Sequence, residues 1–160
     1  MRSPIHLLAT GLALVLASEI RAQSPESAIV LRTVARFVRD SLPKQPIVVD
    51  NEIYRSRPAI TSAEANEVAR DINAARGRFS DIIHCVPGAG RTRMKSCTAR
   101  ESKTVLAFAQ PVIQRDSAEV EVYWVYVYRG RLVGTTAKLA LLRRGADQWL
   151  VSSMRRTGHS

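Results

Sequence analysis

Asp50 and Glu52 are the first side chains in this sequence that could do acid–base chemistry. They stand two residues apart, so on an extended strand both carboxylates would lie on one side. Paired carboxylates can take up and release protons during catalysis. Because this stretch is short and bounded by prolines, the pair is more typical of a solvated strand edge than of a catalytic dyad.

His84 and Cys85 place an imidazole directly before a thiol. Adjacent side chains rarely face each other, however, and a catalytic Cys–His pair is normally assembled from distant parts of the chain. A second cysteine, Cys97, makes the count even, which favours a disulfide in an exported protein. Closing this short loop would stabilise the fold by about 3 kcal/mol. The sequence therefore predicts a Cys85–Cys97 disulfide, with a reactive Cys85 thiol as the alternative.

The stretch between the two cysteines, residues 87–95, combines two glycines with the basic side chains of Arg91, Arg93 and Lys95. It does not match the Gly-x-x-x-x-Gly-Lys-Ser/Thr pattern of a phosphate loop. Recognition residues often sit on loops held by a rigid scaffold, so these three side chains form a candidate anion-binding loop. The chain shows no cofactor motif and no metal-ligand spacing, so we expect neither a cofactor nor a metal.

The first 22 residues have the pattern of a signal peptide. Arg2 is followed by an apolar run over residues 7–17, with small residues at Ala17 and Ala22. Cleavage is expected after Ala22, or alternatively after Ala17. The run is shorter than the roughly 20 residues of a membrane span. We therefore expect an exported protein, periplasmic or secreted, with no membrane span after cleavage and one domain over residues 23–160.

The chain is strongly basic, with a formal net charge of +10. Removing residues 1–22 takes away two arginines and one glutamate, which leaves a charge near +9. Such a charge would attract an anionic partner, for example a nucleic acid, an anionic lipid or an acidic polysaccharide. The alternative is a charge that only keeps the protein soluble.

Two helices are expected in the first half of the domain. The first spans residues 25–42 and begins after Ser24, a good N-cap. Its period predicts one apolar face and one basic face; the apolar residues are Val30, Leu31, Val34, Phe37, Val38 and Leu42, and the basic ones Arg32, Arg36 and Arg39. The second begins with a capping box at Thr61 and Glu64, and Gly77 is expected to cap its C-terminus.

The rest of the chain reads mainly as strands, at residues 47–54, 79–86, 104–110, 118–128, 132–142 and 148–154. In residues 118–128, alternation places Trp124, Tyr126 and Tyr128 on one face. Both faces of that strand become apolar toward its end, which predicts a central position. The expected fold class is α+β, with two N-terminal helices packed on one curved antiparallel sheet.

The final hairpin, residues 138–151, has an apolar strand, a charged turn with Gly145, and then Trp149 followed by apolar residues. In this it resembles the nuclear-transport-factor-like superfamily, which includes ketosteroid-isomerase-like domains. The resemblance implies a cone with a cavity between the sheet and the helices. The cavity lining would come from Tyr54, Asp50, Trp124, Tyr126 and Tyr128. With only two helices marked, a cystatin-like arrangement is the alternative.

No catalytic motif is complete, so the sequence favours a protein that is not an enzyme. The predicted function is a non-catalytic binding or interaction module. The first alternative is a cavity protein that binds, isomerises or hydrolyses a small apolar ligand. The second is a polyanion-binding protein, whose affinity would fall steeply with added salt. The sequence selects neither a partner nor an oligomeric state.

Overall fold

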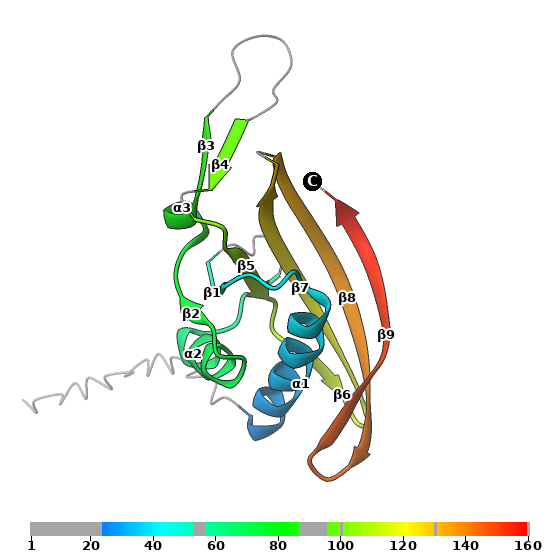
Figure 1. Cartoon of the computed structure of the whole chain (residues 1–160). Helices are drawn as coiled ribbons and strands as arrows, with labels where there is room; N and C mark the ends of the chain where they lie inside the picture. The colour runs from blue at the N-terminus through cyan, green and yellow to red at the C-terminus, as the bar shows by residue number, and fades with distance from the viewer. Residues whose placement is uncertain (1–23, 53–56, 87–95, 100, 130, 160) are drawn as a thin grey trace, which may run out of the picture.

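The computed structural model describes residues 24–52, 57–86, 96–99, 101–129 and 131–159. The expected signal peptide, Tyr54, and the loop residues Arg91, Arg93 and Lys95 lie outside these ranges. The fold is α+β, with helices against one large, mostly antiparallel sheet and a separate two-stranded hairpin (Figure 1). The sequence-based fold class is confirmed at this level.

The large sheet has seven strands in the order β2-β1-β5-β7-β8-β9, with β6 beside β7. Their bounds are β1 (Ile47–Asp50), β2 (Ala75–Arg76), β5 (Thr104–Phe108), β6 (Val112–Gln114), β7 (Ser117–Tyr128), β8 (Arg131–Gly145) and β9 (Gln148–His159). The pairs from β5 onward are antiparallel, whereas β1 runs parallel to both β2 and β5. A wholly antiparallel sheet was therefore a wrong expectation. A helix joins β1 to β2, and such a crossover returns the chain in the same direction.

Helix α1 (Pro25–Ser41) starts where the sequence indicated, because the Ser24 hydroxyl accepts the N–H of Ser27 at 3.1 Å. Its buried face contains Ser27, Val30, Leu31, Val34, Ala35 and Val38. Phe37 was expected on this face and is 38% exposed. The buried face of α1 includes Ala35 on one side. Phe37 lies just outside this face on the other side, next to Val30.

Helix α2 (Ser62–Asp71) begins with the expected capping box. The Thr61 hydroxyl accepts the N–H of Glu64 at 3.2 Å, and the Glu64 carboxylate accepts the N–H of Thr61 at 2.7 Å. The carboxylate is buried and also accepts hydrogen bonds from Ser27 of α1 and Gln110 after β5. Glu64 therefore joins both helices to the sheet.

The end of α2 differs from the expectation. The helix ends at Asp71, and Asn73, with φ of 53°, takes the left-handed position that was assigned to Gly77. Gly77 lies beyond β2, where a Cβ would come within 2.9 Å of the Val48 side chain. The glycine is there because two segments approach closely, not because a helix ends.

The two faces of the sheet bury different cores. On the helix face, α1 and α2 cover Leu106, Phe108, Val120, Val122, Trp124, Leu139 and Leu141. On the opposite face, which we call the hairpin face, Val48, Val105 and Val125 pack with Ile82, Ile83 and Cys97. The central strand β7 is therefore covered on both sides near its C-terminal end, as its alternation predicted.

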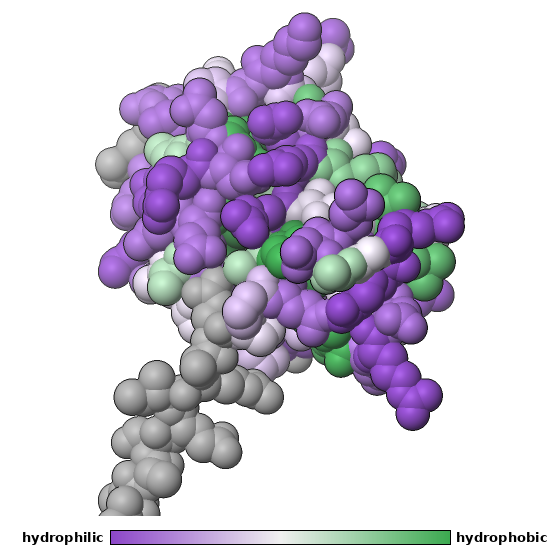
Figure 2. Space-filling view, turned by 90° about the horizontal axis from the view of Figure 1, so that it is seen from below, coloured by the Kyte–Doolittle hydropathy of each residue, from purple (hydrophilic) through white to green (hydrophobic). Residues whose placement is uncertain are grey.

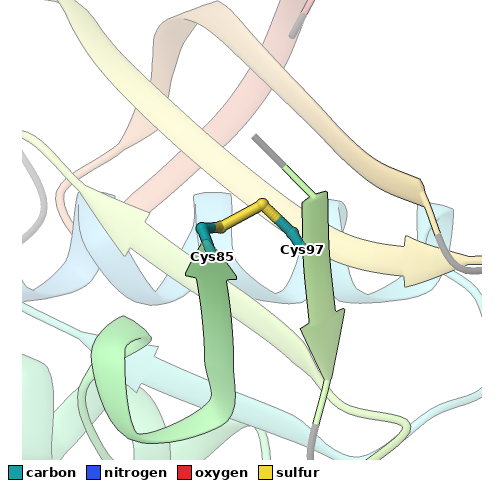
Figure 3. The surroundings of a disulfide bond; sticks show 2 residues. All are labelled: Cys85 and Cys97. Atoms are coloured by element: carbon teal, nitrogen blue, oxygen red, sulfur yellow. A yellow bond between two sulfur atoms is a disulfide. The ribbon is translucent and has the colours of Figure 1, made fainter. Parts of the chain in front are cut away.

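The hairpin face is covered by α3 (Phe79–Ile82) and by β3 (Ile83–Val86) paired with β4 (Ser96–Ala99). Cys85 and Cys97 stand opposite each other in this hairpin and form the expected disulfide (Figure 3). A single strand over residues 79–86 was expected, but its first half is helical. The reason is tertiary, because the Asp50 carboxylate of β1 accepts the N–H of Phe79 at 2.6 Å.

Among the residues that the structure describes, no helix has both the length and the apolar character needed to cross a membrane.

Thr61→Ala should lower the free energy of unfolding by about 1 kcal/mol, because it removes the N-cap acceptor of α2. Urea unfolding measures this loss. Thr33→Ala is the matched control; its hydroxyl bonds only to the Ile29 carbonyl within α1, so stability should stay within about 0.5 kcal/mol. Equal losses in the two variants would contradict the capping role.

Reducing the disulfide should lower the free energy of unfolding by about 3 kcal/mol, because the unfolded chain regains the freedom of the 12-residue loop. Urea unfolding with and without a reductant measures the change. The double variant Cys85→Ser, Cys97→Ser should match the reduced protein and should not respond to the reductant. Identical midpoints for oxidised and reduced protein would contradict this stabilisation.

Candidate ligand-binding pocket

The structure places three of the five expected cavity residues along the helix face or its end. Trp124 and Tyr126 of β7 pack with the core beneath α1. Tyr128, at the end of the strand, is 54% exposed, and the Arg129 guanidinium lies 5.2 Å from its ring centre. Tyr54 is outside the described residues. Trp124 and Tyr126 line a pocket.

Asp50 lies on the hairpin face and not with the aromatic residues. Its side chain is buried, and both oxygens already accept backbone hydrogen bonds, from Glu52 and Phe79, each at 2.6 Å. Glu52 is exposed and pairs with Arg78 at 3.3 Å. The two carboxylates thus act in turn formation and a surface ion pair, and the expectation that Asp50 lines the cavity is not met.

A pocket of about 220 Å³ lies between the C-terminal end of α1 and the helix face of β7, β8 and β9. Its described lining is Val38, Ser41, Leu42, Pro43, Trp124, Tyr126, Val133, Thr135, Met154 and Arg156. Most of these side chains are apolar. The polar groups are a phenol, two hydroxyls and one guanidinium, a composition typical of small-molecule sites.

The end of α1 forms one wall of this pocket. Ser41 is the last helical residue, and its hydroxyl donates to the Phe37 carbonyl at 3.1 Å. Leu42 leaves the helix in an extended conformation, since the following Pro43 disfavours helical geometry. The helix therefore stops before it covers the whole sheet, and the uncovered part of the helix face becomes the pocket floor.

The opposite wall comes from β9, in which the sequence predicted no site residue. Arg156 pairs with Ala137 and Met154 with Leu139 in the β8–β9 ladder. The register shifts three times along this ladder, so simple alternation does not tell which β9 side chains face α1. No signal in the sequence marked Arg156 as a residue that faces α1.

A larger hollow of about 600 Å³ lies over β6, β7 and β8 around Glu119 and Val112. Its charged groups neutralise each other: Arg57 pairs with Glu119 at 3.2 Å and with Glu121 at 3.6 Å, and Lys138 pairs with Glu119 at 3.5 Å. Seen from below, the surface is largely hydrophilic, with hydrophobic residues in small separate patches (Figure 2). Among its described lining residues, both charged side chains, Arg57 and Glu119, are already ion-paired.

The basic face of α1 is partly neutralised in the same way. Arg36 forms a two-pronged ion pair with Asp71, with Nε to Oδ2 at 2.7 Å, and this hydrogen bonding raises the pKa of Arg36 above its ordinary value. Arg39 pairs with the adjacent Asp40. Only Arg32 of the three remains without a carboxylate partner among the described residues. This face is thus a weak candidate for binding a polyanion.

The β3–β4 hairpin carries two residues that the sequence marked for possible chemistry, His84 and Cys85. Because Cys85 is bonded to Cys97, the reactive-thiol alternative is wrong for this structure, and His84 is exposed. Within the described residues there is no group of three or more His, Cys, Asp or Glu side chains that could hold a metal ion. The anion-binding loop stays a prediction, since it falls outside those residues.

Searches of protein-family models, of curated proteins and of solved structures found no match to this chain. The resemblance of the final hairpin to nuclear-transport-factor-like domains therefore stays a prediction. The pocket has to be interpreted from its own residues.

Asp50→Ala should lower the free energy of unfolding by about 1–3 kcal/mol, because it leaves two backbone N–H groups without their acceptor. Thermal and urea unfolding measure the loss. Glu52→Ala is the control, and it should cost under about 1 kcal/mol because the lost ion pair with Arg78 is exposed. Full stability of Asp50→Ala would contradict this structural role.

Proposed function

We propose that this protein is an exported, non-catalytic binding module that holds a small, mainly apolar ligand between α1 and the helix face of the sheet. The observation that carries the proposal is the pocket in which Trp124 and Tyr126 stand opposite the end of α1. Aromatic side chains supply large apolar contact area at low entropic cost, and they dominate many binding sites. This proposed function combines two that the sequence predicted, a binding module and a cavity protein.

Binding is favoured over catalysis by the chemistry of the pocket lining. Its described residues include no carboxylate, imidazole or thiol, which are the usual general bases and nucleophiles. Asp50, the one carboxylate expected there, faces the other side of the sheet and is fully hydrogen-bonded. An isomerase-like mechanism with Asp50 as base therefore has no support in this geometry.

Two further observations support the remaining parts of the proposal. Helices on one face of a curved sheet (Figure 1) are compatible with a cone that is open at one end, as in nuclear-transport-factor-like domains. The Cys85–Cys97 disulfide is compatible with an oxidising compartment outside the cytoplasm. These observations support our proposal of a location outside the cytoplasm and of a cone in preference to the cystatin-like arrangement.

The proposal is tested by nuclear magnetic resonance with a set of small aromatic, cycloalkyl and short-alkyl fragments. Trp124 lies in the pocket, whereas Trp149 lies at the other end of the helix face. Their β8 partners, Thr135 and Arg143, are about 25 Å apart along the strand. Bound fragments should shift the indole N–H signal of Trp124 and leave that of Trp149 unchanged.

Val133→Phe places a ring inside the pocket and should abolish these shifts. Val112→Phe adds the same ring at an exposed position outside the pocket and should leave them intact. Circular dichroism checks that both variants fold. Fragments that fail to shift Trp124 at millimolar concentration, or that still bind to a folded Val133→Phe, would contradict the proposed function.

A further inference from the structure

We propose that the pocket selects a small organic anion, a carboxylate with an aromatic or cycloalkyl body, and that Arg156 binds the carboxylate. This inference rests on the proposed function and adds the charge of the ligand. It starts from the only charged side chain in the described lining of the pocket, the Arg156 guanidinium on β9.

Arg156 has no carboxylate partner among the described residues, although a second arginine on the same face does. Arg143 forms ion pairs with Glu26 of α1 and with Asp116, and its guanidinium lies 4.9 Å from the Trp149 ring centre. The start of α1 thus neutralises one arginine of the helix face. The lining at the end of α1 offers Arg156 no carboxylate. The carboxylate of a ligand would pair with Arg156 as Glu26 and Asp116 pair with Arg143.

A β-bulge lies directly next to Arg156. Thr136 pairs with Gly158 and Ala137 pairs with Arg156, so Thr157 is an extra residue in β9. The Thr157 hydroxyl donates to the Thr136 carbonyl at 3.3 Å and ties the bulge to β8. Bulges commonly re-aim side chains beside functional sites. Here the bulge directly follows Arg156, which lines the pocket.

The size of the pocket limits the ligand. Its 220 Å³ is the volume that roughly seven water molecules occupy in the liquid, and it lies below the range of about 300–1,000 Å³ for drug-sized ligands. A single ring with one carboxylate is of this scale. A nucleotide or a polymer is too large to be enclosed, although it could touch the rim.

The surrounding charges also fix the orientation of the ligand. The last carbonyl groups of α1 carry partial negative charge, so an anion is disfavoured at the α1 wall. The carboxylate must therefore lie on the β9 side, beside Arg156, with the apolar body between Trp124 and Leu42. The phenol O–H of Tyr126 and the hydroxyl of Thr135 are further donors in the same lining.

The test compares two matched pairs of probes, benzoate with benzamide and cyclohexanecarboxylate with cyclohexanecarboxamide. Each pair keeps the apolar body and changes only the charge. Titrations follow the indole N–H signal of Trp124, with that of Trp149 as the internal reference. Because Arg156 is exposed, its ion pair with the ligand is screened by water, and we expect each carboxylate to bind about fivefold more tightly than its amide.

Arg156→Gln should remove this preference, so that each carboxylate binds no more tightly than its amide, because the variant lacks the positive charge. Arg155→Gln is the matched control. Arg155 is also exposed, pairs with Lys138 in the ladder and is absent from the pocket lining, so the preference should persist. Loss of the preference in both variants would indicate general attraction to a basic surface and would overturn the role of Arg156.

The remaining outcomes separate this inference from the proposed function. If carboxylate and amide shift Trp124 with equal affinity, the pocket binds apolar molecules but does not select anions, and only the inference fails. If no probe shifts Trp124 and the wider fragment set does, the pocket does not accept these small anions and the inference again fails alone. If nothing shifts Trp124, both fail together.

Discussion

The buried carboxylate of Glu64 holds the two helices and the sheet in one arrangement. It accepts hydrogen bonds from Ser27 of α1 at 3.2 Å, from Thr61 at the start of α2 at 2.7 Å and from Gln110 after β5 at 2.6 Å. A buried charge is tolerated only when its hydrogen-bonding capacity is used. Since these donors come from different parts of the fold, moving any one of them would take a hydrogen bond away from the buried carboxylate.

This constraint acts at the N-terminal end of α1 and fixes how the helix lies on the sheet. Glu26 reaches Arg143 at the same end, so α1 is held there by both a hydrogen bond and an ion pair. The other end stops at Ser41 and leaves part of the helix face uncovered. The pocket therefore lies where α1 ends, and Val38 and Ser41 of the helix belong to its lining.

The two faces of the sheet differ in how they are covered. Around Val48, Val105 and Val125, the hairpin face is covered by α3 and by the disulfide-linked hairpin, and Asp50 is hydrogen-bonded to the start of α3. Because that carboxylate starts the turn of α3, it is unavailable for chemistry. The helix face carries a pocket lined by Trp124, Tyr126 and Arg156, and Arg156 has no carboxylate partner among the described residues. We infer that binding occurs there, where apolar surface and unmet charge coincide.

The sequence by itself determined the elements whose signals are local. The capping box at Thr61, the N-cap at Ser24 and the alternation of β7 depend on neighbours a few residues away, and the structure confirms all three. The disulfide also followed from two cysteines and a short loop. Trp124 and Tyr126 were placed correctly on one face because the side-chain period of a strand is fixed.

Only the tertiary structure decided the features that depend on contacts between distant segments. The parallel pairing of β1, the helical turn at Phe79 and the separation of Asp50 from the aromatic residues all follow from such contacts. Arg156 entered the pocket through the register shifts of the β8–β9 ladder, and a shift of one residue moves a side chain to the other face. The residues of β9 alone do not predict how the strand pairs with β8, because this register depends on β8 and on the packing of α1 against the sheet.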